Sequence, residues 1–339
     1  MRNPLTKRIP REIKDDLGKY IALFLFLILS IGFISGFLVA GDSMKSAFDN
    51  SFEKYNVEDG NFELAQKADA DTIKSIEEEN VTLYENFYVE NSTDDFESTL
   101  RIYADRKEVD KVCLLDGDIP AADSEIALDR LYAKNNDLSI GDTISVAGKE
   151  LKIVGIVALS DYSALYQNNT DFMFDSIKFG VGIMTDGGFE SRGDSHLHYN
   201  YSWKYDTPPS DPQGKEAKDM AEDFMTALST KAVLTGFIPR CSSNAINFAG
   251  NDMGGDRTMI LTMMYVLIVI IAFVFAITTS NTITKESNVI GTLRASGYTK
   301  AELIRHYMAS PLIVLFIAAI VGNILGYTCL LYTSDAADD

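Results

Sequence analysis

Residue types with specialised chemistry are scarce in this chain of 339 residues, which contains three cysteines, three histidines and one tryptophan. Cys113, Cys241 and Cys329 are too few and too scattered for a disulfide framework or a CxxC metal pattern. Cys113 and Cys241 either pair with each other or remain free thiols, and the sequence does not choose between these. A fold held together by several disulfides is excluded.

Catalytic motifs are also missing. Two Gly-Lys-Glu triplets, at residues 148–150 and 214–216, lack the spacing and the hydroxyl of a phosphate-binding loop, and no HExxH, GxSxG or kinase signature occurs. His196 and His198, with nearby Asp194, fit a solvated loop better than a metal site, because no further ligands follow at zinc-like spacing. We therefore expect no enzyme activity, no catalytic residue, no cofactor and no metal.

Long apolar runs, in contrast, are prominent. Three runs of roughly 20 residues would each form a helix of about 30 Å, which matches the hydrocarbon core of a bilayer. They predict transmembrane helices at residues 20–40, 258–280 and 310–331. A cleaved signal peptide ending near Val39-Ala40-Gly41 is the alternative for the first run, but the run and its basic leader are long for a signal peptide.

The acidic residues lie mostly between the first two runs. Residues 42–257 hold 41 of the 49 acidic and 20 of the 30 basic residues, a net charge of −21, which argues against a nucleic-acid partner. Six basic residues precede the first run, and only Lys45 and Lys54 follow closely after it. The positive-inside rule therefore places the N-terminus and residues 281–309 in the cytoplasm and residues 41–257 outside, in a multi-pass protein of the cell membrane.

The sequence between the first two runs mixes helical and strand patterns. Helical spacing predicts helices at residues 71–79, 125–135 and 215–229, and alternating segments predict strands at 81–90 and 98–104 and a hairpin about Gly148-Lys149. The expected fold class is thus α-helical transmembrane segments with a large α+β extracytoplasmic domain inserted between the first and second spans.

The two ends of the chain carry weaker signals. Leu5, Ile9, Ile13 and Leu17 form one apolar stripe, which predicts an amphipathic cytoplasmic helix within residues 1–19; a disordered basic tail is the alternative. Residues 332–339 follow the third run without a basic anchor, and we interpret them as a non-native tail.

Pairs of glycines occur at GxxxG spacing in the first and third runs. They are Gly32 and Gly36, and Gly322 and Gly326. This spacing allows two helices to approach closely, but the sequence identifies no partner for either pair.

The segment at residues 281–309, called the connector from here on, joins the second and third runs. Ile290, Leu293 and Tyr298 alternate with glycine and arginine, which indicates a short structured segment with an apolar face and cationic ends. Such a segment suits docking to a cytoplasmic protein. An ordinary membrane elbow, or a basic helix lying on lipid, is the alternative.

The connector sequence resembles the FtsX-like permease family of ABC transporters, in which an acidic residue precedes an I-G-x-L-[RK]-A-x-G pattern. Ser296 is a mild departure, and four blocks between residues 115 and 157 resemble the MacB-like core domain of such permeases. The residues that match the family pattern are Glu286, Ile290, Gly291, Leu293, Arg294, Ala295 and Gly297.

The resemblance implies a permease subunit that hydrolyses nothing itself. A separate ABC ATPase subunit would bind the seven matching residues and drive export or extraction of an amphiphile such as a peptide, a lipoprotein or a lipid. The implied partners are this ATPase, the lipid bilayer and a second permease unit in a dimer or pseudo-dimer, and the chain would be the N-terminal part of a longer permease. Mechanotransmission to an extracytoplasmic partner, or a membrane-anchored binding domain without an ATPase, is the alternative function.

Overall fold

The computed structural model describes residues 8–193 and 196–335, with side chains up to Thr328. The chain forms two compact units: unit 1 comprises the residues up to Ser46 and from Met253 onward, and unit 2 comprises Ala47–Asp252. The first seven residues of the expected N-terminal helix, Asp194, and the last four residues of the expected tail lie outside the described residues.

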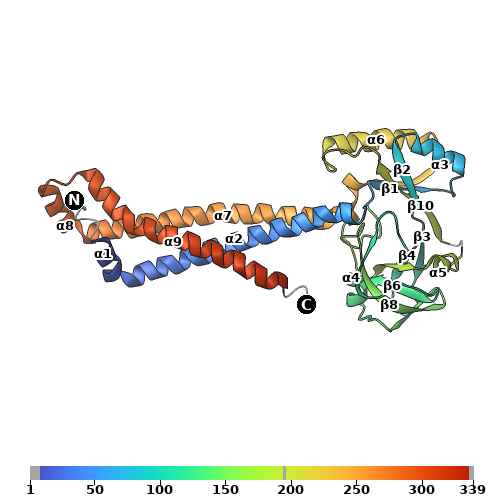
Figure 1. Ribbon diagram of the computed structural model, residues 1–339, viewed down its shortest axis with the longest axis horizontal. Coiled ribbons are helices and arrows are strands. Elements are labelled where there is room, and N and C mark those ends of the chain that lie inside the picture. The colour runs from blue at the N-terminus through green and yellow to red at the C-terminus, as the bar shows by residue number, and fades with distance from the viewer. Residues whose placement is uncertain (1–7, 194–195, 336–339) are drawn as a thin grey trace. The chain divides into compact units, whose positions relative to one another are not determined.

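Unit 1 is built from helices. The short α1 (Ile9–Asp15) precedes α2 (Leu17–Lys54), α7 (Asn244–Lys285) ends just before the short α8 (Ser287–Ala295), and α9 (Lys300–Asp335) follows. The path through α7, α8 and α9 can be followed in Figure 1 in orange to red. Helix α2 extends beyond the first apolar run as far as Lys54.

Three helices, α2, α7 and α9, are long and apolar enough to cross a membrane. Much of their apolar surface is open: Leu29, Phe33, Tyr265 and Phe273 are each more than half exposed. A contiguous surface of this kind is unfavourable in water and suits contact with lipid. The expectation of three apolar helices is confirmed.

Helices α2 and α9 cross at their glycines. A Cβ atom on Gly32 would lie 3.2 Å from the carbonyl oxygen of Gly322, and one on Gly36 would lie 3.2 Å from that of Gly326. A Cβ atom on Gly326 would be only 2.6 Å from the carbonyl oxygen of Gly32. The two GxxxG pairs, for which the sequence identified no partner, are therefore partners of each other, because only glycine allows the backbones to come this close.

Unit 2 contains a sheet of mostly antiparallel strands, whose hydrogen-bonded path runs β11-β1-β10-β3-β4-β9-β6-β8-β5, with β2 on β10 and β7 on β8. The pairs β4–β9 and β6–β8 are parallel. The strands are β1 (Gly60–Leu64), β2 (Val81–Glu85), β3 (Tyr88–Ser92), β4 (Thr99–Ala104), β5 (Val112–Gly117), β6 (Glu125–Asp129), β7 (Thr143–Val146), β8 (Lys149–Leu159), β9 (Phe179–Met184), β10 (Leu197–Tyr205) and β11 (Leu234–Pro239).

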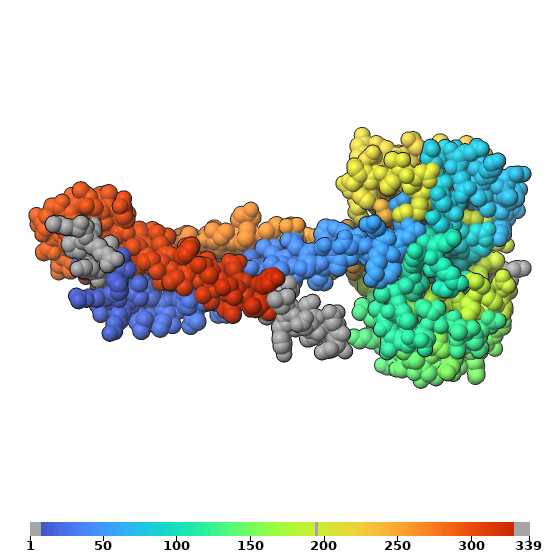
Figure 2. Space-filling view, in the orientation of Figure 1, coloured from blue at the N-terminus to red at the C-terminus, as the bar shows by residue number. Residues whose placement is uncertain are grey.

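Two apolar cores divide unit 2 into two lobes. In lobe A, α3 (Ala70–Glu77) and α6 (Lys215–Ser229) lie with β1, β2, β10 and β11 around a core centred on Trp203. In lobe B, α4 (Arg130–Asn135) and α5 (Asp186–Glu190) lie with the remaining strands around a core that includes Tyr132. Figure 1 shows α3 and α6 together over lobe A, and Figure 2 shows lobe A mainly in light blue and yellow and lobe B mainly in green.

Most elements of unit 2 agree with the sequence patterns, with two corrections. The strand expected at 81–90 is interrupted and forms β2 and β3. The helices expected at 71–79 and 215–229 are present as α3 and α6, and the expected hairpin is β7–β8. The helix expected at 125–135 is wrong over its first half, which forms β6, and only its second half is helical, as α4. Strand β6 is buried on both faces, so its continuous apolar run lacks the alternation that distinguishes a strand from a helix. Cys113 and Cys241 are free thiols.

Candidate functional site

The seven residues expected to contact an ATPase subunit lie on α8 or directly beside it. Helix α8 has no buried residue, so it presents side chains to its surroundings along its whole length. The seven differ in exposure: Gly291, Arg294, Ala295 and Gly297 are exposed, whereas Glu286, Ile290 and Leu293 are half-buried. The seven residues therefore lie together on or beside one short helix, but only four of them are exposed.

Gly297 shapes the connector. It has a φ of +93°, in the left-handed region that costs other residues about 1–2 kcal/mol. Its N–H donates to the carbonyl of Arg294 at 3.1 Å, and the N–H of Tyr298 donates to the carbonyl of Leu293 at 3.2 Å. This pair of bonds is a Schellman motif, which ends α8 and turns the chain.

A second local motif begins α9 immediately afterwards. The Thr299 N–H donates to Glu302 Oε2 at 2.9 Å, and the Glu302 N–H donates to Thr299 Oγ1 at 3.3 Å. This reciprocal pair is a capping box, with Glu302 at the third position of the helix. The turn between α8 and α9 is therefore determined by hydrogen bonds among neighbouring residues of the connector.

Glu286, at the start of α8, belongs to a polar cluster that the sequence did not reveal. Its Oε2 accepts hydrogen bonds from the Tyr307 hydroxyl at 2.7 Å and from Arg8 Nη2 at 3.3 Å. Arg8 Nε also lies 3.2 Å from Glu12, whose Oε1 is 3.0 Å from His306 Nε2. These contacts tie α1 to α8 and α9. Glu286 therefore fixes the start of the connector to α1 and α9. No local sequence pattern predicts these contacts, because the partners of Glu286 are distant in sequence.

A polar pocket of about 200 Å³ lies in unit 2 between residues of both lobes. Its lining comes from β1, β3, β4, β10 and β11 and from the long segment that joins β8 to β9. The residues that carry its charge are Glu58, Glu63, Arg101 and Asp161. The lining also contains four tyrosines, Tyr88, Tyr103, Tyr162 and Tyr166.

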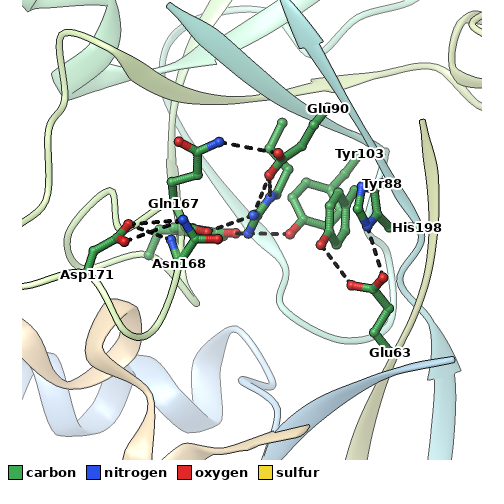
Figure 3. Close-up of polar contacts among 10 residues, drawn as sticks. Glu63, Tyr88, Glu90, Tyr103, Gln167, Asn168, Asp171 and His198 are labelled. Carbon is green, nitrogen blue, oxygen red and sulfur yellow. Dashed lines mark hydrogen bonds and ion pairs between the residues drawn. The ribbon is translucent and has the colours of Figure 1, made fainter. Parts of the chain in front are cut away.

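Arg101 organises one wall of the pocket, beside Glu90 and Gln167, which are labelled in Figure 3. Its guanidinium donates to Glu90 Oε1 at 2.8 Å, to the Tyr162 hydroxyl at 2.7 Å and to the backbone carbonyl of Gln167 at 2.8 Å. It also lies 4.4 Å from the centre of the Tyr88 ring. Arg101 therefore joins β3 and β4 to the β8–β9 segment, and its charge is matched by Glu90.

Glu63 lies in a second wall and is paired with His198, which is not part of the lining. The Tyr88 hydroxyl donates to Glu63 at 3.1 Å, and His198 Nδ1 lies 3.0 Å from the same carboxylate (Figure 3). The hydrogen bond to His198 lowers the pKa of Glu63, against the opposing effect of burial. His198 lies on β10 and stacks on Tyr88 at 4.5 Å, so its assignment to a solvated loop is wrong.

A buried group of carboxyls lies behind the pocket. The Ser202 hydroxyl donates to Glu58 and lies 3.2 Å from Asp110, whose other oxygen accepts the Glu58 N–H at 2.8 Å. Asp161 is held in a bidentate pair by Arg106, at 2.7 and 2.8 Å. Burial, with a further contribution from the charge of Asp161, raises the pKa of Glu58 to about 7. Burial and the nearby Glu58 likewise raise the pKa of Asp110.

The buried carboxyls behind the pocket predict that the stability of unit 2 depends on pH. Because the pKa of Glu58 is about 7 in the folded state and 4.5 in the reference state, the folded state binds more protons between these values, and stability falls as pH rises through them. The shift corresponds to about 3 kcal/mol, and Glu58→Gln should flatten this slope. Urea unfolding at several pH values, followed by the fluorescence of the single tryptophan, Trp203, measures it. An unchanged slope in Glu58→Gln would contradict the assignment.

The connector lies within the part of the chain that matches a known family. Residues 261–335 match the FtsX-like permease C-terminal family. The matched permease segment contains most of α7, all of α8, and α9 to its end at Asp335. This match confirms the resemblance seen in the connector. No curated protein matches the chain.

The chain aligns with domains of three solved structures at low sequence identity. The extracellular domain of the noncanonic ABC-type transporter YknZ from Gram-positive bacteria aligns at 11% identity and a TM-score of 0.30, over 52% of this chain and 100% of that one. The periplasmic region of MacB from Actinobacillus actinomycetemcomitans aligns at 10% identity and 0.29, over 51% and 85%. A domain of a putative permease from Porphyromonas gingivalis aligns at 11% and 0.24, over 53% and 84%.

Proposed function

We propose that this chain is the membrane permease subunit of an ABC transporter and couples ATP hydrolysis by a separate ATPase to export or extraction of an amphiphilic peptide, lipoprotein or lipid. The observation that carries the proposal is the family match over residues 261–335, which falls on two span-length helices joined by the exposed α8. The chain itself would then transmit motion and hydrolyse nothing.

The proposal includes a topology. Residues 1–19 and the connector would face the cytoplasm, where the ATPase is, and residues 41–257 would form the extracytoplasmic domain. The basic residues before the first span and in the connector support this orientation. The contact of Arg8 with Glu286 supports it too, because it joins two segments that the proposal puts on the same side of the membrane.

Within the connector, we propose that some residues contact the ATPase and that others determine the position of α8. Gly291, Arg294 and Ala295 are exposed and would meet the ATPase directly. Gly297 and Glu286 would act indirectly, since one ends α8 and the other fixes its start. The backbone of a short helix that is already held at both ends loses little conformational entropy on binding, which favours docking.

Copurification tests the proposal. The detergent-solubilised product of the intact gene should bring with it a stoichiometric ATPase subunit, identified by mass spectrometry. Arg294→Glu should reduce the captured ATPase at least about tenfold, because it reverses an exposed cation at the contact and removes the hydrogen bond from Arg294 Nη1 to the Tyr298 carbonyl.

The matched control is Arg130→Glu, which makes the same substitution at an exposed position of unit 2 and should capture the ATPase as the parent does. An equal amount of ATPase with Arg294→Glu, or none with the folded parent protein, would contradict the assignment and favour an anchored binding domain.

A further inference from the structure

A second polar pocket lies in unit 1, between the start of α2 and the end of α7, which are blue and orange in Figure 1. Its volume is about 280 Å³, and it is called the α2–α7 pocket from here on. Its lining is polar throughout and consists of Asp16, Lys19, Thr278, Asn281, Thr282 and Lys285. The four residues from α7 are three or four positions apart, so they lie on one face of that helix. The end of α7 therefore presents a polar face to the start of α2.

Lys19 supplies the net positive charge of the α2–α7 pocket. Lys285 Nζ lies 2.8 Å from Asp16 Oδ1, so these two charges compensate each other. Lys19 Nζ instead donates to two uncharged oxygens, the Thr282 hydroxyl at 2.6 Å and the Thr278 carbonyl at 3.4 Å. Among the residues that the structure describes, no carboxylate forms an ion pair with Lys19. An ammonium group has three N–H donors, so at least one is left for an anionic ligand.

The α2–α7 pocket lies at the end of the apolar spans. Lys19 directly precedes the first expected span, and Asn281 directly follows the second. Apolar side chains on the same helical turns are open, since Ile21 of α2 is 47% exposed and Ile277 of α7 is 60% exposed. A polar pocket beside open apolar helix surface suits an amphiphile whose head group enters the pocket and whose acyl chains lie along the helices.

The charges of the lining select among lipid head groups. Two lysines and one aspartate leave a net charge that matches the single negative charge of a phosphodiester. Asp16 disfavours a phosphate dianion, and the exposed Lys285 disfavours a head group that ends in a quaternary ammonium. Asn281 can donate to and accept from a hydroxyl. Phosphatidylglycerol, whose head group is a phosphodiester with a glycerol, combines these features.

We propose that the α2–α7 pocket binds the phosphodiester of an anionic phospholipid of the cytoplasmic leaflet, with Lys19 donating to a phosphate oxygen. The choice of leaflet rests on the topology in the proposed function, whereas binding itself requires only that the helices lie in a membrane. Lys19 belongs to α2 and already contacts Thr278 and Thr282 of α7. A bound lipid would therefore hold the two helices together at this end.

Native mass spectrometry of the detergent-solubilised full chain, titrated with phosphatidylglycerol, tests the proposal. We expect one retained lipid per chain. Lys19→Met should weaken binding at least about tenfold, because it removes a charged hydrogen bond to the phosphate, whereas Lys19→Arg should keep most of the affinity. The matched control is Lys14→Met, which removes an exposed lysine of α1 outside the lining and should bind as the parent does.

Asp16→Asn gives a readout of the opposite sign, which a purely structural role would not produce. The substitution removes the negative charge from the lining and releases Lys285, so the affinity for phosphatidylglycerol should rise about threefold or more. Phosphatidic acid, which carries more negative charge, should gain more than phosphatidylglycerol does. This variant also tests the proposal if Lys19→Met fails to fold.

Free phosphate is the other source of the same chemistry, so inorganic phosphate at millimolar concentration serves as a competitor. It should not displace the lipid, because the acyl chains add contacts along α2 and α7. The proposal is overturned by loss of phosphatidylglycerol from the folded parent, by equal retention of phosphatidylcholine, by displacement with inorganic phosphate, or by equal effects of Lys14→Met and Lys19→Met. These measurements involve no ATPase, so their outcome is independent of the copurification test.

Discussion

Gly326→Leu is expected to destabilise the packing of α2 against α9 by about 3 kcal/mol or more. Overpacking usually costs about 1–3 kcal/mol because side chains can shift, but here the Cβ atom itself would lie 2.6 Å and 2.8 Å from backbone atoms of Gly32 and Gly36. Backbone atoms of a helix cannot move aside singly, so the helices must separate. The temperature at which the detergent-solubilised protein aggregates, followed by size-exclusion chromatography after heating, should fall clearly.

The chain offers a graded series and a matched control for this experiment. Gly32→Leu should destabilise the packing less, because its Cβ atom would lie 3.2 Å from its nearest neighbour. Gly41→Leu, on the same helix as Gly32 but with open space around it, should aggregate at the same temperature as the parent. Parent-like melting of Gly326→Leu would show that α2 and α9 do not cross at their glycines.

Asp161→Ala is expected to lower the free energy of unfolding of unit 2 by about 3–5 kcal/mol. The substitution leaves Arg106 as an uncompensated charge whose side chain is only 5% exposed. The substitution also removes the negative charge of Asp161 near Glu58, which reduces the destabilisation slightly. Urea unfolding followed by Trp203 fluorescence measures the change, because Trp203 is the single tryptophan and is fully buried in lobe A.

Two further variants separate the lost ion pair from the lost packing. The double variant Arg106→Met with Asp161→Leu removes both charges and should recover most of the stability. Lys67→Met breaks the exposed ion pair of Lys67 with Glu85 and should change stability by less than about 1 kcal/mol. If Asp161→Ala were as mild as Lys67→Met, the buried pair would contribute little.

Features that depend on neighbouring residues could be predicted from the sequence. The apolar runs gave the three span-length helices, and the periodicity of residues 215–229 gave α6 with the same bounds. Strand β6 could not be recognised, because Ile126, Ala127 and Leu128 are all buried and show no alternation. Its burial on both faces depends on the sheet around it, which the local pattern does not contain.

The candidate sites could be predicted only in part, for the same reason. The family pattern located α8, yet it could not separate the exposed Arg294 from Glu286, whose partners Arg8 and Tyr307 are distant in sequence. The polar pocket left no signal, because Glu58 and Asp161 come from segments about a hundred residues apart. The spacing of residues in a sequence therefore predicts a site only where its side chains lie on one helix or strand.

The turn between α8 and α9 has a consequence for how this connector can change. Its path depends on the backbone of Gly297 and on the reciprocal bonds of Thr299 and Glu302, none of which involves a side chain on the exposed face of α8. The course of the turn is therefore determined mostly by residues outside that face, although Arg294 Nη1 also donates to the Tyr298 carbonyl at 3.2 Å. If α8 contacts an ATPase as proposed, a different partner would require different side chains at exposed positions such as Ala295, while the backbone could keep the same course.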